Sequence, residues 1–135
     1  MWRAVGGIVL GLVTWAIVVT LLNFGLRAAI SDYHAAEATL DFTLAMKIGR
    51  LVEAALASIV AGAVTAWIAP DKRWATWVVG LVLLAAFVPE HIKLWARFPI
   101  WYHLTFLLTL APLVAFGGVL ARNAKAAGLR PATAS

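Results

Sequence analysis

The chain has 135 residues, of which 64% are hydrophobic and 13% charged, and it contains no cysteine. A water-soluble domain is about half apolar and about a quarter charged, so this composition excludes an ordinary soluble globular protein. The lack of cysteine excludes disulfide frameworks, iron–sulfur clusters, thiolate metal sites and cysteine nucleophiles. The net charge of +5 comes from basic residues at the ends of apolar segments, a pattern that indicates the flanks of membrane spans and argues against a nucleic-acid partner.

The first apolar segment, residues 4–26, contains no charged side chain. About 20 apolar residues in a helix cross the roughly 30 Å hydrocarbon core of a bilayer, so this segment is expected to be a membrane span. Arg3 in front of it would also suit a signal peptide. The apolar part of a signal peptide, however, has about 7 to 15 residues and ends at a small-residue cleavage site. The segment fits neither feature, and we expect it to be retained.

Three more apolar segments are expected to span the membrane, at about residues 45–69, 74–89 and 98–121. Pro70 cannot continue a helix and Asp71 is suited to cap the next one, so the second and third spans form a tight hairpin. The sequence therefore predicts an all-α membrane protein, in which residues 1–122 form one domain, an antiparallel bundle of four transmembrane helices.

Short polar segments are predicted after spans one and three, where the chain lies at the membrane surface. Residues 31–41 carry several acids and a histidine and are expected to form a loop or a short surface helix. Residues 90–97 mix charged and apolar side chains, as a second interfacial helix would. Residues 123–135 are polar and small, so a disordered tail is expected after the last span.

Four spans place both termini on the same side of the membrane, and the basic residues indicate which side. Those on the side of the termini are Arg3, Lys72, Arg73, Arg122, Lys125 and Arg130. Those on the other side are Arg27, Lys47, Arg50, Lys93 and Arg97. Because cytoplasmic segments carry the excess of Lys and Arg, both termini are expected in the cytoplasm.

Small residues recur at every fourth position on two of the predicted spans. They are Gly7 and Gly11 on span one, and Ala54, Ser58, Gly62 and Ala66 on span two. Small side chains at this spacing let helix backbones approach closely in lipid, where close packing drives association. We expect these residues to pack inside the bundle, with a homodimer face as the alternative. Leu83 on span three is expected to face lipid.

Two charged residues fall within span two, close to its start. Arg50 lies on the same helix face as the small residues and Glu53 is its i+3 neighbour, so the favoured interpretation is an ion pair packed inside the bundle. An ionisable residue in a membrane span is also a functional hypothesis by default. The alternative is therefore an anion site at Arg50 or a proton relay through Glu53.

The histidines His34, His91 and His103 are predicted to lie on one side of the membrane, close to Glu90. Imidazole and carboxylate groups are ligands for zinc and other divalent metals. No two of these histidines have helical spacing, so a metal site would have to be assembled from separate segments, and haem would need histidines deeper in the bundle. We therefore expect interfacial hydrogen bonding for the histidines, with no metal and no cofactor, and the sequence identifies no catalytic residue.

Several stretches of the sequence carry a likeness to a known family. They are residues 42–50, residues 62–70, the run Phe87-Val88-Pro89-Glu90-His91, the run Phe98-Pro99-Ile100-Trp101-Tyr102-His103-Leu104-Thr105-Phe106, and Gly117-Gly118. On these stretches the sequence resembles an uncharacterised family of small bacterial four-span membrane proteins. The resemblance implies a four-span fold and a bacterial inner membrane, and it brings no activity with it.

The expected function is that of a non-catalytic integral membrane protein. Such a chain would contact the lipid bilayer and act as a structural or accessory subunit, in a homo-oligomer or in a larger membrane complex. The first alternative is a small transporter or channel made of several copies, because four short spans leave little room for an aqueous path within one chain. The second alternative is a membrane enzyme or metal-binding protein that uses the histidines and acids of the outer side.

Overall fold

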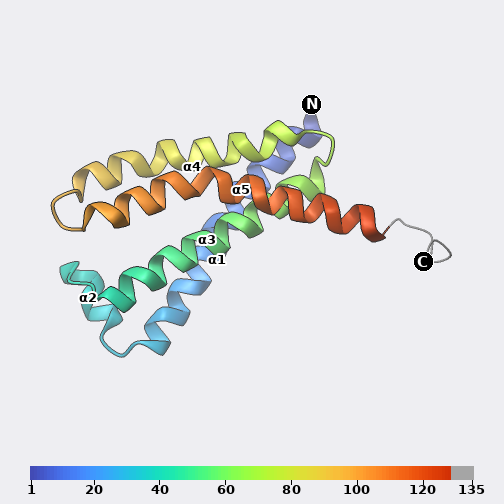
Figure 1. Ribbon diagram of the computed structural model, residues 1–135. Coiled ribbons are helices and arrows are strands. Elements are labelled where there is room, and N and C mark those ends of the chain that lie inside the picture. Colours follow the sequence, from blue (N-terminus) through green and yellow to red (C-terminus); the bar gives the residue numbers. More distant parts are fainter. Residues whose placement is uncertain (129–135) are drawn as a thin grey trace.

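The structure, a computed structural model, describes residues 1–128 and is built from helices, with no strand in that range. The helices are α1 (Trp2–Ala29), α2 (Tyr33–Thr39), α3 (Leu44–Ile68), α4 (Arg73–Lys93) and α5 (Ile100–Gly128) (Figure 1). Four of them, all except α2, are long and apolar enough to cross a membrane. The predicted all-α, four-span architecture is confirmed, and the chain is a multi-pass membrane protein.

Helix α3 is the central element of the bundle. It packs mainly against α1 on one side and α5 on the other, and α4 packs against α5. In Figure 1 the start of α1, the turn between α3 and α4 and the end of α5 lie at one end of the molecule, whereas α2 and the turn between α4 and α5 lie at the other. The polar residues near α2 and near the α4–α5 turn are therefore brought to the same end.

The helix backbones come closest where small residues face each other. The small residues of α3 are all buried, as are Gly7 and Gly11 of α1. A methyl group added at Gly62 would overlap the carbonyl oxygen of Val114 on α5, and one added at Gly7 would lie 3.0 Å from the carbonyl oxygen of Thr65 on α3. These residues therefore pack against neighbouring helices of the same chain, where the lack of a side chain permits direct backbone contact.

Toward the α2 end, aromatic side chains take the place of glycine between the helices. Phe87 of α4 lies 5.1 Å from Trp15 of α1 and 5.1 Å from Phe106 of α5, measured between ring centroids. In Figure 1 the α4–α5 hairpin diverges from α1 and α3 in this direction. Bulky rings hold the helices further apart here than the glycines do at the other end, and this leaves room for cavities inside the bundle.

Two predicted helix ends are wrong. Helix α4 continues through Pro89 to Lys93, so residues 90–97 are not a separate interfacial helix but the last turn of α4 followed by turns. A proline removes one hydrogen bond from the ladder, and α4 nevertheless continues to its C-cap Leu94, whose N–H donates to the Glu90 carbonyl oxygen. Helix α5 extends to Gly128, so residues 123–128 are helical rather than disordered, in keeping with their alanines. The rest of the predicted tail lies outside the described residues.

Two side chains also differ from expectation. Leu83 is only 7% exposed and belongs to the main hydrophobic core, so the prediction that it faces lipid is wrong. Lys72, and not Asp71, is the N-cap of α4. Of the seven tryptophans, only Trp15 is buried, and its indole nitrogen donates to Ser58 Oγ at 3.1 Å. The other tryptophans are exposed near the helix ends, as side chains at membrane interfaces are.

Candidate functional site

Arg50 is the centre of a polar cluster at the α2 end of the bundle. It lies in the second turn of α3 and donates from Nη1 to Tyr33 Oη at 3.0 Å and from Nε to Tyr102 Oη at 3.2 Å. Its guanidinium carbon lies 4.7 Å from the centroid of the Phe42 ring. Two neutral phenols and an aromatic face therefore hold this cation, and its positive charge is not cancelled by these contacts.

The predicted ion pair between Arg50 and Glu53 is not formed. The ion pairs within residues 1–128 are Arg27 with Glu37 and Lys93 with Glu90. Glu53 is 8% exposed, and its Oε2 atom makes no hydrogen bond within that range. Sequence spacing placed the two side chains one turn apart on α3, but it did not reveal that α2 and α5 supply tyrosine acceptors for the guanidinium group.

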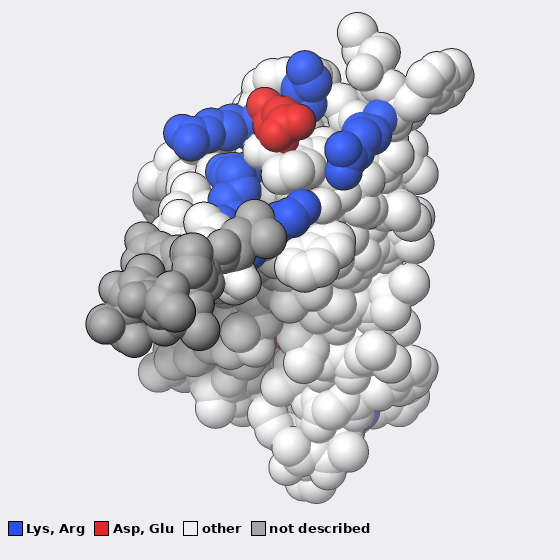
Figure 2. All heavy atoms as spheres, turned by 90° about the vertical axis from the view of Figure 1, so that its right-hand side faces the viewer, with Lys and Arg blue, Asp and Glu red and all other residues white. Residues whose placement is uncertain are grey.

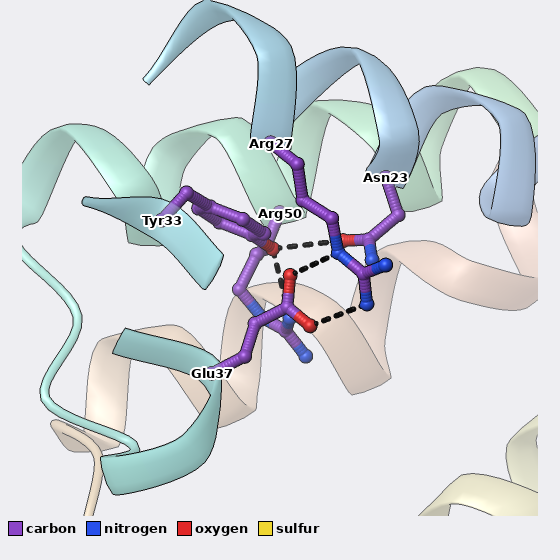
Figure 3. A network of polar contacts seen from close by, with 5 residues as sticks. All are labelled: Asn23, Arg27, Tyr33, Glu37 and Arg50. Carbon is purple, nitrogen blue, oxygen red and sulfur yellow. Dashed lines mark hydrogen bonds and ion pairs between the residues drawn. The ribbon is translucent and has the colours of Figure 1, made fainter. Parts of the chain in front are cut away.

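The cluster extends from Arg50 to α1 through α2 (Figure 3). Tyr33 Oη donates to Asn23 Oδ1 at 3.0 Å, and Arg27 donates to Glu37 from Nε at 2.8 Å and from Nη2 at 2.7 Å. The bidentate bond from Arg27 lowers the pKa of Glu37, while burial raises the pKa of Tyr33. These contacts attach the short surface helix α2 to both α1 and α3, and so fix the Tyr33 hydroxyl beside Arg50.

Two of the three candidate histidines meet at the α4–α5 turn. His91 Nδ1 and His103 Nδ1 are 2.7 Å apart, so one of them carries a hydrogen that the other accepts. His103 is fully buried, stacks on Trp95 with ring centroids 4.6 Å apart, and makes no hydrogen bond through Nε2 within residues 1–128. His34 is exposed on α2. The predicted hydrogen bonding thus takes the form of a direct contact between His91 and His103, in the protein interior rather than in water.

Two adjoining cavities connect the histidine pair with the Arg50 cluster. The outer cavity, about 200 Å³, is lined by Glu90, His91 and His103, and the inner cavity, about 190 Å³, by Trp15 and Glu53. The residues that line both cavities are Arg50, Phe87, Tyr102 and Phe106. All five polar candidates from the sequence therefore border one region of the bundle.

This region combines aromatic walls with a few polar groups. Glu90 is exposed at its outer edge and pairs with Lys93 at 3.2 Å. Within residues 1–128 no group of three or more His, Asp or Glu side chains is arranged to hold a metal ion. The arrangement is suited to hydrogen bonding with a small ligand, because polar side chains and aromatic rings line the same two cavities.

Sequence reasoning missed the two tyrosines that orient Arg50. Tyr102 stands next to His103 in the stretch that carried the family resemblance, but nothing in that stretch linked it to span two. Tyr33 belongs to a polar segment whose helical fold and contact with α3 could not be read from local spacing. Buried tyrosine hydroxyls generally have a hydrogen-bond partner. This rule was the available signal that Tyr33 and Tyr102 would contact a polar side chain.

Comparison with known proteins does not extend these findings. No family model matches the chain, and neither a curated protein nor a solved structure matches it. The four-span membrane architecture is therefore the part of the family resemblance that the structure supports.

Proposed function

We propose that this chain is a non-catalytic accessory protein of the bacterial inner membrane that binds a small molecule with hydrogen-bonding groups between its helices. The observation that carries the proposal is the pair of cavities described above, whose lining includes the side chains of Glu53 and His103. Each of these side chains has one buried polar atom, Glu53 Oε2 and His103 Nε2, without a partner within residues 1–128. A buried polar atom without a partner costs about 1–3 kcal/mol. A small rotation of either side chain would turn its unpaired atom toward a ligand in the cavity, and the hydrogen bond formed would recover part of this cost.

The proposal is tested by identifying what the protein carries from its own membrane. Val19 lines the inner cavity, so Val19→Phe should fill it. Val13 on the same helix is 47% exposed to the membrane, and Val13→Phe is the matched control. Each protein is extracted with its native lipid, and bound small molecules are measured by mass spectrometry. Wild type and the control should retain a compound that Val19→Phe loses. Equal retention by all three, or no retained compound, would contradict the proposal.

A second candidate is a subunit of a small oligomeric transporter or channel, supported by a groove on the outside of the bundle. The groove, about 430 Å³, lies between α1 and α3, and its lining includes Gly25, Ala45 and Gly49. A methyl group added at Gly25 would meet no described atom within 4 Å. Small residues beside an open groove permit close approach of another helix. Because the chain has no cysteine, cross-linking of Gly25→Cys in membranes, with Val13→Cys as the control, tests for a second copy.

We further propose that both termini lie in the cytoplasm. The basic side chains at the terminal end gather on one face around an acidic one (Figure 2). They come from the start of α1, the α3–α4 turn and the end of α5, and they include Arg3, Lys72, Arg73, Arg122 and Lys125. Together with Arg130 the terminal end has six basic residues against five at the other end, and this excess favours the cytoplasmic side by the positive-inside rule.

A further inference from the structure

The ligand class follows from the shape and the chemistry of the two cavities. Each cavity is smaller than the roughly 300 Å³ at which pockets for drug-sized molecules begin, so one substituted ring is the largest group that fits. About half of the lining residues of each cavity are Phe, Tyr or Trp, and the shared lining places Phe87, Tyr102 and Phe106 around the same space. Flat aromatic walls favour a planar ligand, which stacks against them or meets their edges.

The polar groups require a ligand that accepts hydrogen bonds and is uncharged. Within residues 1–128 the hydrogen bonds of Arg50 use Nε and Nη1, which leaves its Nη2 amino group to donate to a ligand oxygen. An inorganic anion would meet the Glu53 carboxyl group in the same cavity, and a carboxylate repels an anion. A neutral carbonyl oxygen accepts from Arg50 without this penalty. Glu53 and His103 can in turn accept or share the proton of a reduced, hydroxyl form of the same carbonyl.

A groove on the membrane side of the bundle adjoins the inner cavity. This groove, about 210 Å³, runs between α3 and α5 and is lined mainly by apolar side chains such as Leu51, Leu110 and Leu113. It shares Ala54 and Phe106 with the inner cavity. A tail that passes between Ala54 and Phe106 from a ring in the cavity would lie in this groove, in contact with the lipid.

From these features we infer that the cavity binds the ring of a membrane quinone, a neutral 1,4-diketone with an apolar tail, and that the tail lies in the groove between α3 and α5. The inference rests on the proposed ligand-binding function and specifies its ligand. A quinone dissolves in the bilayer, so it reaches the site from the membrane. Its carbonyl oxygens lie at opposite ends of a flat ring, which matches a site with Glu53 in the inner part, His103 in the outer part and Arg50 in the lining of both.

The test uses the full chain in lipid nanodiscs prepared without quinone. Two probes are compared: radiolabelled decylubiquinone, and the same dimethoxy-methyl-benzoquinone ring without a tail. Wild type should bind decylubiquinone saturably, above the amount that dissolves in empty nanodiscs. Val19→Phe should lower the affinity for both probes about tenfold or more, and Arg50→Lys should do the same because a single ammonium group replaces the planar guanidinium donor. Val13→Phe should bind like wild type.

The groove is tested separately with two neighbouring positions on α5. Thr109 lines the groove, whereas Leu108 is 70% exposed and lies outside its lining. Thr109→Phe should weaken binding of decylubiquinone about tenfold but leave the tail-less ring unchanged, and Leu108→Phe should change neither. Circular dichroism of each variant checks that the helices are intact.

The outcomes separate the inference from the function on which it rests. Binding that does not saturate, or that is equal in wild type and Val19→Phe, would mean that quinone only dissolves in the lipid and would overturn the inference. If wild type then still retains another native compound that Val19→Phe loses, the ligand-binding function stands with a different ligand. If it retains none, both proposals fail.

Discussion

Replacement of Gly62 by alanine tests whether direct backbone contact between α3 and α5 holds the bundle together. A Cβ atom at this position would overlap the Val114 carbonyl oxygen and would lie 2.7 Å from the Val114 carbonyl carbon and 3.1 Å from the Gly118 nitrogen. These neighbours are backbone atoms, so no side chain can rotate away, and the two helices must separate. Overpacking of this kind costs about 1–3 kcal/mol.

The matched control is Gly25→Ala, because an added methyl group there meets no described atom within 4 Å. In both variants alanine favours the helix by up to about 1 kcal/mol relative to glycine. The difference between the two variants therefore isolates the steric effect, and Gly62→Ala should have a free energy of unfolding about 1–3 kcal/mol lower than Gly25→Ala. Leu83→Ala would be a poor control, because Leu83 is buried and its truncation leaves a cavity.

The free energy of unfolding is measured by titration of mixed micelles with a denaturing detergent, with helix content followed by circular dichroism. Equal stability of Gly62→Ala and Gly25→Ala would show that α3 and α5 do not make this contact. Gly117→Ala provides a second measurement of the same interface, since its Cβ would overlap the Ile59 carbonyl oxygen on α3.

Three further predictions concern the charged residues and the topology. The pKa of Glu37 is lowered in the folded protein, so its ion pair stabilises the fold at every pH above the usual glutamate pKa. This stabilisation is lost as the pH falls through the lowered pKa. The thermal midpoint of wild type should thus fall more on acidification than that of Glu37→Gln, and parallel curves would refute this. Because no ion pair joins Arg50 and Glu53, which share a cavity lining, the thermal midpoint of the double variant Arg50→Met with Glu53→Gln should lie below that of either single variant, and recovery toward wild type would instead reveal a direct pair. Cysteines at Ala35 and Lys72, both exposed, should react with an impermeant thiol reagent from opposite sides, with Ala35 labelled from outside; labelling of both from one side would contradict the span count.

The membrane spans could be predicted from the sequence because each depends on a local property. An uncharged run such as residues 4–26 is long enough to cross a bilayer whatever its neighbours do. The errors occurred at the ends of the helices, where local signals conflict. Pro89 indicated an end to the third span, but the loss of one hydrogen bond did not outweigh the remaining ladder and the contacts of His91 beyond it.

The candidate site was only partly predictable, since it joins residues that are distant in the sequence. Arg50, Glu53 and His103 were identified as unusual because each is polar in an apolar context. Their partners were not, because the contact between Arg50 and Tyr102 spans 52 positions and depends on the way α5 packs on α3. Spacing within one helix therefore favoured the wrong partner for Arg50.

The central place of α3 has a consequence for the synthesis of the protein. Its small residues pack against α1 and α5, but α5 follows α3 and α4 in the chain, so a ribosome inserts it last. Until α5 enters the bilayer, Gly62 and the buried Glu53 have lipid or a passing helix as neighbours in place of their final ones. A chain interrupted after α4 therefore exposes a polar carboxyl group and bare backbone to the membrane, where both are costly.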